Sequence, residues 1–392
     1  MNFRTPRAAA AAILAAAALL VPATPAQADQ IRNNQWHLRY LNVDEAHKLS
    51  QGQGVTVAVL DTGVDPHPDL RNNLLPGTDV VPGGTGDGRQ DIDGHGTAMA
   101  GLIAAHGRRN DQGALGIAPE SKILPVRIYT KSASTDGDKI AKGIEWAVAH
   151  GARVISISSG ASSSPHLRSA VEAAMKADVV IVAAAGNNPP DFVVTFPAFI
   201  EGVLAVAATD RRGNHSAVSV TGDKVAIAAP GVDIHSTSYD GKYFRGTAGT
   251  SGATAIVAGA AALVRSKYPD LSAQEVVHRL TATATDKGPQ GRDPEYGFGV
   301  VNLVAALTAD VPPLQPTGGP SATPSPEPEA SGTAATPAPT ANSSGGGLAI
   351  GLLVLVLLAA AGAVAIVVAR RRSPGNSRPP AEPRSAAEPR SG

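Results

Sequence analysis

Hydrophobic residues form short, nearly continuous runs along this chain, separated by segments with helical spacing. The first run, residues 54–60, is rich in β-branched side chains and lacks strict polar alternation, the pattern of a strand buried on both faces. Similar runs follow at residues 122–128, 153–158, 179–184, 203–207 and 225–229. These runs predict a mainly parallel β-sheet.

Amphipathic segments between the runs predict helices. Residues 138–150 repeat apolar side chains at helical spacing. Ser164 before Pro165 predicts an N-cap and a first helical turn, and Ser272 with Glu275 is a capping-box pattern. Alternating strands and helices predict an α/β fold of three layers, α/β/α, in which functional groups gather at the carboxyl ends of the strands.

The N-terminus has the pattern of a secretory signal peptide. Two arginines precede an apolar run at residues 8–21, and a small-x-small site, Ala26-Gln27-Ala28, follows. This order of charge, apolar run and small residues predicts that residues 1–28 are a signal peptide. A permanent N-terminal membrane anchor is the alternative.

A second apolar segment, residues 348–369, contains no charged side chain. As a helix of 22 residues it would be roughly 33 Å long, enough to cross a hydrocarbon core of about 30 Å. Three arginines follow at residues 370–372, so the positive-inside rule places the tail, residues 370–392, in the cytoplasm. We therefore expect one transmembrane helix in the lipid bilayer, with the rest of the protein outside the cell. A buried core helix is the alternative, but no folded sequence follows that could cover it.

A proline-rich segment, residues 311–347, precedes that helix. It contains nine prolines and almost no large apolar residue, which predicts a flexible stalk. The remaining residues, 29–310, are expected to form one globular domain of ordinary size for an α/β enzyme.

Charge and cysteine content narrow the classes of function. Lys and Arg total 33 and so do Asp and Glu, so no overall field favours nucleic acid. Cysteine is absent, which excludes thiol catalysis and cysteine metal sites. Asp87, Asp91 and Asp93 do not have the spacing of an EF-hand loop, and a solvated acidic loop is the simpler interpretation. We expect no metal site and no cofactor.

Asp61 is the first candidate for chemistry, because it directly follows the first buried strand in Asp61-Thr62-Gly63. The same tripeptide also marks aspartic proteases, in which two carboxylates share one proton. That mechanism needs a second such motif in this chain or in a partner, and the sequence contains no second one.

Three further polar residues occupy comparable positions. His95 lies between glycines at the start of a predicted helix, Ser251 begins a long apolar helix, and Asn187 ends the strand at residues 179–184. Each has a structural alternative: a helix-start histidine, an N-cap serine or a turn asparagine. Together with Asp61 they supply an orienting carboxylate, a general base, a nucleophile and an oxyanion donor.

These residues lie in motifs that resemble the subtilisin-like serine proteases. The motifs are Val59-Leu60-Asp61-Thr62-Gly63, Asp93-Gly94-His95-Gly96-Thr97, Ala184-Ala185-Gly186-Asn187 and Gly249-Thr250-Ser251. The resemblance implies a subtilisin-like fold in which Asp61, His95 and Ser251 form a catalytic triad and Asn187 stabilises the oxyanion. It also implies that the polypeptide substrate binds along two backbone edges, formed by Ser158, Ser159, Gly160, Ala184, Ala185 and Gly186.

The wider layout resembles the mycosins, membrane-anchored subtilases associated with type VII secretion in actinobacteria. The resemblance implies a membrane-anchored endopeptidase linked to a type VII secretion complex. The sequence departs from the family pattern at Gly252, Ala255 and Ile256, next to Ser251. A weakly active or inactive subtilase-fold protein, with a structural or regulatory role in such a complex, is therefore the alternative.

Overall fold

The computed structural model describes residues 27–130 and 136–314. The predicted signal peptide up to residue 26, the predicted stalk beyond residue 314, the predicted membrane helix and the predicted tail lie outside these residues. Within the described ranges, no helix combines the length and the apolar character needed to cross a bilayer.

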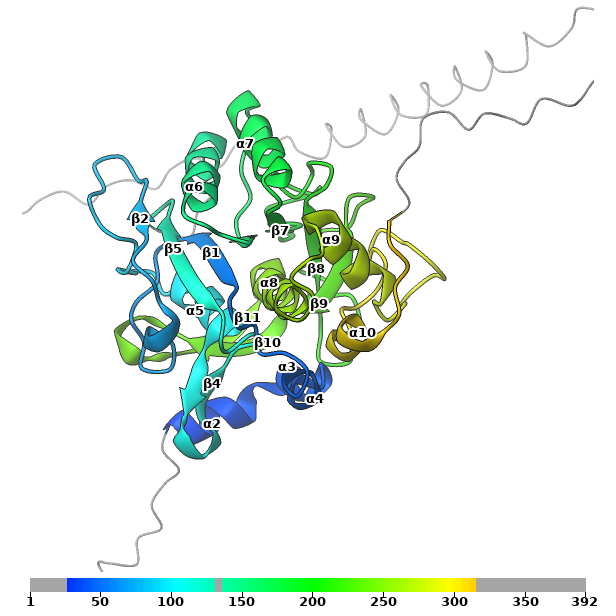
Figure 1. Cartoon of the computed structure of the whole chain (residues 1–392), viewed down its shortest axis with the longest axis horizontal. Helices are drawn as coiled ribbons and strands as arrows, with labels where there is room; N and C mark the ends of the chain where they lie inside the picture. The colour runs from blue at the N-terminus through cyan, green and yellow to red at the C-terminus, as the bar shows by residue number, and fades with distance from the viewer. Residues whose placement is uncertain (1–26, 131–135, 315–392) are drawn as a thin grey trace, which may run out of the picture. The chain divides into compact units, whose positions relative to one another are not determined.

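A seven-stranded sheet forms the centre of the described domain, in the order β2-β5-β1-β6-β7-β8-β9 (Figure 1). Every neighbouring pair in it is parallel, which confirms the predicted parallel sheet. Six of its strands match the six apolar runs. The strands are β1 Thr56–Asp61, β2 Thr78–Asp79, β5 Lys122–Arg127, β6 Val154–Ile157, β7 Val180–Ala184, β8 Leu204–Thr209 and β9 Ile227–Pro230.

Helices cover both faces of this sheet (Figure 1). One face packs against α6 (Gly137–Ala149) and α7 (Pro165–Lys176), and the other against α5 (His95–Ala104) and α8 (Thr250–Lys267). Successive residues of β1 alternate between the two cores: Val57 and Val59 join the α5 and α8 side, while Ala58 and Leu60 join the α6 and α7 side. Both sides of β1 are therefore buried, which explains its continuous apolar sequence.

The predicted helix starts are confirmed. The Ser164 side chain accepts a hydrogen bond from the Leu167 N–H at 3.0 Å, with Pro165 in the first turn of α7. In α9 (Ala273–Ala282), Ser272 and Glu275 form the reciprocal capping box, since each side chain accepts from the other's backbone N–H. These caps satisfy backbone donors that have no partner within the helix.

Several smaller elements did not emerge from the sequence pattern. They are the helices α2 (Gln27–Asn34), α3 (Trp36–Tyr40), α4 (Val43–His47) and α10 (Leu303–Thr308), the 3₁₀ turns η2 (Arg71–Asn73), η3 (Arg109–Asp111) and η4 (Tyr239–Gly241), and two hairpins, β3 (His106–Arg108) with β4 (Gln112–Leu115) and β10 (Val232–Thr237) with β11 (Tyr243–Ala248).

The segment before β1 is built into the domain. The buried Gln35 side chain hydrogen-bonds both backbone groups of Leu115, and the Trp36 indole N–H donates to the carbonyls of Val232 and Asp233 at 3.1 Å. Each of these contacts joins the N-terminal helices to one of the hairpins.

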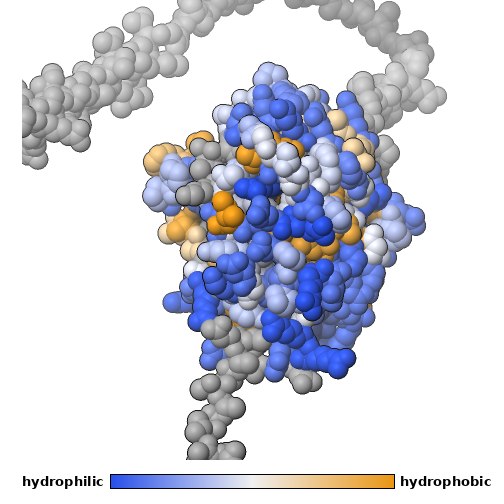
Figure 2. Space-filling view, turned by 90° about the vertical axis from the view of Figure 1, so that its left-hand side faces the viewer, coloured by the Kyte–Doolittle hydropathy of each residue, from blue (hydrophilic) through white to orange (hydrophobic). Residues whose placement is uncertain are grey.

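The side of the domain nearest β2 is mostly hydrophilic, with its hydrophobic side chains in separate groups (Figure 2).

Candidate active site

Asp61 and His95 are in direct contact at the carboxyl edge of the sheet. Asp61 is the last residue of β1 and His95 the first of α5. The Nδ1 atom of His95 lies 2.8 Å and 2.9 Å from the two carboxylate oxygens of the buried Asp61. Because a carboxylate only accepts, Nδ1 carries the proton, and Nε2 is the free basic nitrogen of a neutral ring.

Asp91 holds the turn that precedes His95. One oxygen of its buried carboxylate accepts from the Thr62 hydroxyl and from the N–H groups of Asp93 and Gly94. The other oxygen accepts from the Thr97 N–H and hydroxyl. Both oxygens are therefore occupied by protein donors, which joins the end of β1 to the start of α5. Among the described residues, no group of three His, Asp or Glu side chains is placed to hold a metal ion.

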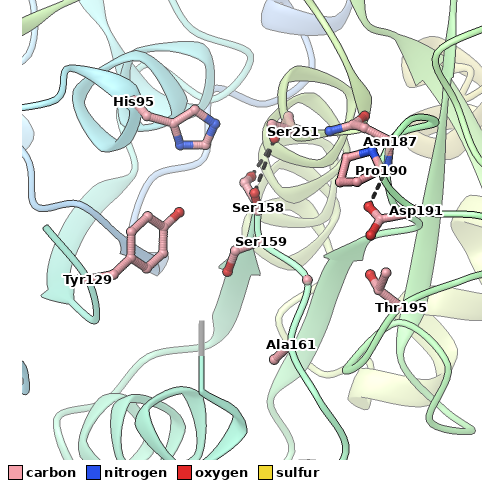
Figure 3. Close-up of a pocket in the computed structure, with 11 residues that line it drawn as sticks. His95, Tyr129, Ser158, Ser159, Ala161, Asn187, Pro190, Asp191, Thr195 and Ser251 are labelled. Atoms are coloured by element: carbon pink, nitrogen blue, oxygen red, sulfur yellow. Dashed lines mark hydrogen bonds between the residues drawn. The ribbon is translucent and has the colours of Figure 1, made fainter. Parts of the chain in front are cut away.

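Ser251 lies in the first turn of α8, as its sequence position predicts. Its hydroxyl donates to the Ser158 carbonyl at 3.1 Å, and the Ser158 hydroxyl donates to the Ser251 carbonyl at 3.2 Å. The His95 ring is directed toward Ser251 (Figure 3). The structure thus brings both side chains to one site, with the serine hydroxyl bonded to a backbone carbonyl and not to the imidazole.

The Asn187 side chain has a defined orientation. Its amide oxygen accepts the Thr250 N–H at 2.8 Å, and because the amide NH₂ group cannot accept a hydrogen bond, this contact fixes which end of the amide faces Thr250. The amide nitrogen then points toward Ser251 (Figure 3). In the described ranges no group accepts a hydrogen bond from this nitrogen, which leaves a donor directed at the site.

A pocket of about 490 Å³ contains these groups. It is lined by His95, Tyr129, Ser158, Ser159, Gly160, Ala161, Asn187, Pro190, Asp191, Thr195 and Ser251. Ser158, Ser159 and Gly160, which the resemblance assigns to substrate binding, are among these lining residues. Ala184, Ala185 and Gly186 do not line the pocket: they are buried, and the side chains of Asp191 and Thr195 lie against Gly186.

The electrostatic environment affects the protonation of His95. Burial disfavours the charged imidazolium, but the nearby carboxylates of Asp61, Asp93 and Asp91 outweigh it and raise the pKa of His95 above its ordinary 6.5. Burial also raises the pKa of the Tyr129 phenol well above 10, so this pocket residue stays neutral.

Known proteins confirm the family that the motifs suggest. The family model of the subtilases matches residues 52–299, more than half of the chain. The chain belongs to the subtilase family. This subtilase is a serine endopeptidase, which excludes the aspartic protease interpretation of Asp61.

Its relatives include a subtilisin and an alkaline protease. The subtilase is 41% identical over 273 residues to subtilisin Savinase of Lederbergia lenta, an alignment covering 69% of this chain and 97% of that protein. It is 39% identical over 269 residues to the thermostable alkaline protease of Halalkalibacterium halodurans, covering 68% of this chain and 72% of that protein.

Similar solved structures include mycosins. The crystal structure of MycP1 from Mycobacterium smegmatis matches the subtilase with a TM-score of 0.63 and 33% identity, covering 73% of this chain and 89% of that one. The structure of MycP3 protease from the type VII (ESX-3) secretion system matches with a TM-score of 0.61 and 36% identity, covering 74% of this chain and 90% of that one.

Sequence reasoning did not single out several residues that line the pocket of this subtilase, which are Tyr129, Ala161, Pro190, Asp191 and Thr195. Tyr129 follows β5 closely, at the same sheet edge as Asp61, and that position was a usable signal. For Asp91 the sequence pattern indicates only a solvated acidic loop, whereas the structure buries its carboxylate beside His95. Asp191 and Thr195 belong to the loop after β7, where no local pattern indicates which side chains turn into the pocket.

Proposed function

We propose that this subtilase cleaves peptide bonds by acyl transfer, with Ser251 as nucleophile, His95 as general base and Asp61 as the orienting carboxylate. The observation that carries the proposal is the 2.8 Å contact between His95 Nδ1 and Asp61, in the pocket that also contains Ser251. Fixing the proton on Nδ1 leaves Nε2 free to take the serine proton.

The proposed reaction requires one side-chain movement. The Ser251 hydroxyl rotates from the Ser158 carbonyl toward His95 Nε2 when substrate binds, and transfers its proton as it attacks the substrate carbonyl. The resulting imidazolium is stabilised by Asp61 and then protonates the leaving amine. The Asn187 amide and the Ser251 N–H donate to the oxyanion. Because Ser251 lies at the start of α8, the helix dipole also favours the negative charge that develops there.

We further propose that the enzyme is exported and held at the cell membrane by residues 348–369, with its tail in the cytoplasm, and that it works with a type VII secretion complex. Support comes from the sequence pattern at both ends of the chain and from the similarity to MycP1 and MycP3.

Labelling with a fluorophosphonate probe, which reacts with activated serines, tests the chemistry. The purified domain should be labelled and should hydrolyse peptides, whereas Ser251→Ala should lose both activities and keep its circular dichroism spectrum. Ser169→Ala removes an exposed hydroxyl on α7 and serves as the matched control with normal labelling.

The same experiment separates the enzyme from its alternative. A weakly active or inactive subtilase with a structural role in a secretion complex would fold normally but react with the probe slowly or not at all. Undiminished labelling of the Ser251→Ala variant would instead show that the nucleophile is misassigned.

A further inference from the structure

Asp191 contributes a carboxylate to the wall of the pocket. Among the described residues that line the pocket, it is the only ionisable one apart from His95 and Tyr129. No lysine, arginine or histidine of the described ranges forms an ion pair with its carboxylate. Its single hydrogen bond there comes from the Asn187 N–H, which donates to Oδ2 at 2.8 Å.

The backbone holds this carboxylate in place. The Asp191 N–H donates to the Asn187 carbonyl at 2.8 Å, while the Asp191 side chain accepts the Asn187 N–H. These reciprocal bonds close a tight turn directly after the proposed oxyanion donor. The carboxylate faces the Ser158 and Ser159 segment across the pocket (Figure 3), so it does not have to move to meet a substrate side chain.

Two glycines and one threonine define the space beside Asp191. A Cβ atom on Gly160 would lie 2.9 Å from Thr195 Oγ1, and one on Gly186 would lie 3.0 Å from Asp191 Oδ2. Side chains at these two positions would therefore collide with the pocket wall. Thr195 lies beside both glycines, and Asp191 lines the same pocket as Ser251, so a substrate side chain that enters this pocket can meet the Asp191 carboxylate.

We infer that this pocket selects a cationic side chain, lysine or arginine, at the residue immediately before the scissile bond, through an ion pair with Asp191. The inference rests on the proposed function, because it assumes that the peptide is cleaved at Ser251. A carboxylate that carries only one hydrogen bond keeps the capacity to accept more from an ammonium or guanidinium group.

The size of the preference follows from the strength of such bonds. A hydrogen bond to a charged partner corresponds to about 10- to 100-fold in affinity. We therefore expect kcat/KM for a lysine peptide to exceed that of the norleucine peptide, which has a similar chain without the charge, by about 10- to 100-fold. A glutamate peptide should be cleaved least, because its carboxylate would face Asp191 without a counter-charge.

The test measures kcat/KM on three peptides that differ only in lysine, norleucine or glutamate before the scissile bond. The variant Asp191→Asn keeps an oxygen that can accept the Asn187 N–H and removes the charge, so the ratio of lysine to norleucine should fall close to one. Asp270→Asn makes the same change at an exposed residue outside the pocket and should leave the ratio unchanged.

The wild-type measurement tests the preference for a cationic side chain even if the Asp191→Asn variant does not fold. Preference for lysine that weakens at high ionic strength supports the ion pair. A wild-type enzyme that reacts with the fluorophosphonate probe but cleaves norleucine as fast as lysine overturns the inference and leaves the proposed function intact. An enzyme that neither reacts with the probe nor cleaves any of the peptides overturns both.

Discussion

Replacing Asp91 with asparagine tests how strongly one buried carboxylate supports His95, the proposed general base. The Asp91 side chain accepts five hydrogen bonds, three on Oδ1 and two on Oδ2, and the residue is only 3% exposed. An amide has nearly the same shape, but its NH₂ group cannot accept. Whichever way the amide turns, its NH₂ group faces protein donors, and the buried position leaves them without an acceptor.

The less costly orientation places the NH₂ group toward Thr97, which loses the two bonds on Oδ2. Hydrogen bonds to charged groups contribute about 1.5–3 kcal/mol each, so Asp91→Asn should lower the free energy of unfolding by about 3–6 kcal/mol. Asp87→Asn is the matched control in the same loop. Asp87 is paired only with Arg89 at the surface, and losing that pair should cost about 1 kcal/mol or less.

The same substitution should change catalysis in a defined direction. The negative charge of Asp91 contributes to the raised pKa of His95, so the neutral variant should have a lower His95 pKa. The acid limb of the profile of kcat/KM against pH should then move to lower pH. Urea unfolding followed by tryptophan fluorescence measures the stability, and peptide hydrolysis across pH measures the limb. A variant with wild-type stability and an unchanged acid limb would refute this account of Asp91.

Four further outcomes are expected. Asn187→Ala should lower kcat by about 10²–10³ with little change in KM, a range taken from a member of this same family. Asn188→Ala changes an exposed residue in the same turn and should leave both constants normal. An increase in KM alone would instead make Asn187 a turn residue. The wild-type kcat/KM should fall as His95 becomes protonated, with a midpoint above 6.5 because its pKa is raised, and a midpoint below about 5 would contradict a histidine base. Gly252→Ala should raise the free energy of unfolding by about 0.4–1 kcal/mol, because alanine lowers the conformational entropy of the unfolded chain. The added Cβ would lie 3.6 Å from its nearest neighbour and so should fit. Destabilisation in urea would instead show strain at this position. In cells stripped of their wall, added protease should remove a tag in the catalytic domain and spare one after Arg372; the reverse pattern would refute the proposed topology.

The sequence by itself determined six strands of the central sheet and the starts of several helices. Each apolar run became a strand of the parallel sheet, because both of its faces had to be buried. Ser164 and Ser272 marked helix starts through local hydrogen bonds that span only three residues. Since such patterns act over short distances, they also placed Asp61 at a strand end and His95 at a helix start before any contact between them was known.

Only the tertiary structure decided which side chains meet. The contact of Asp61 with His95 and the bond from the Ser251 hydroxyl to Ser158 join residues that are 34 and 93 positions apart. The positions of Asp191 and Thr195 beside Gly186 likewise follow from the path of a loop that no local pattern specifies. Local periodicity specifies the face on which a side chain lies, but the direction in which a loop side chain turns depends on groups brought beside it by packing. For that reason the candidate triad could be predicted from motifs, whereas the charge in the pocket wall could not.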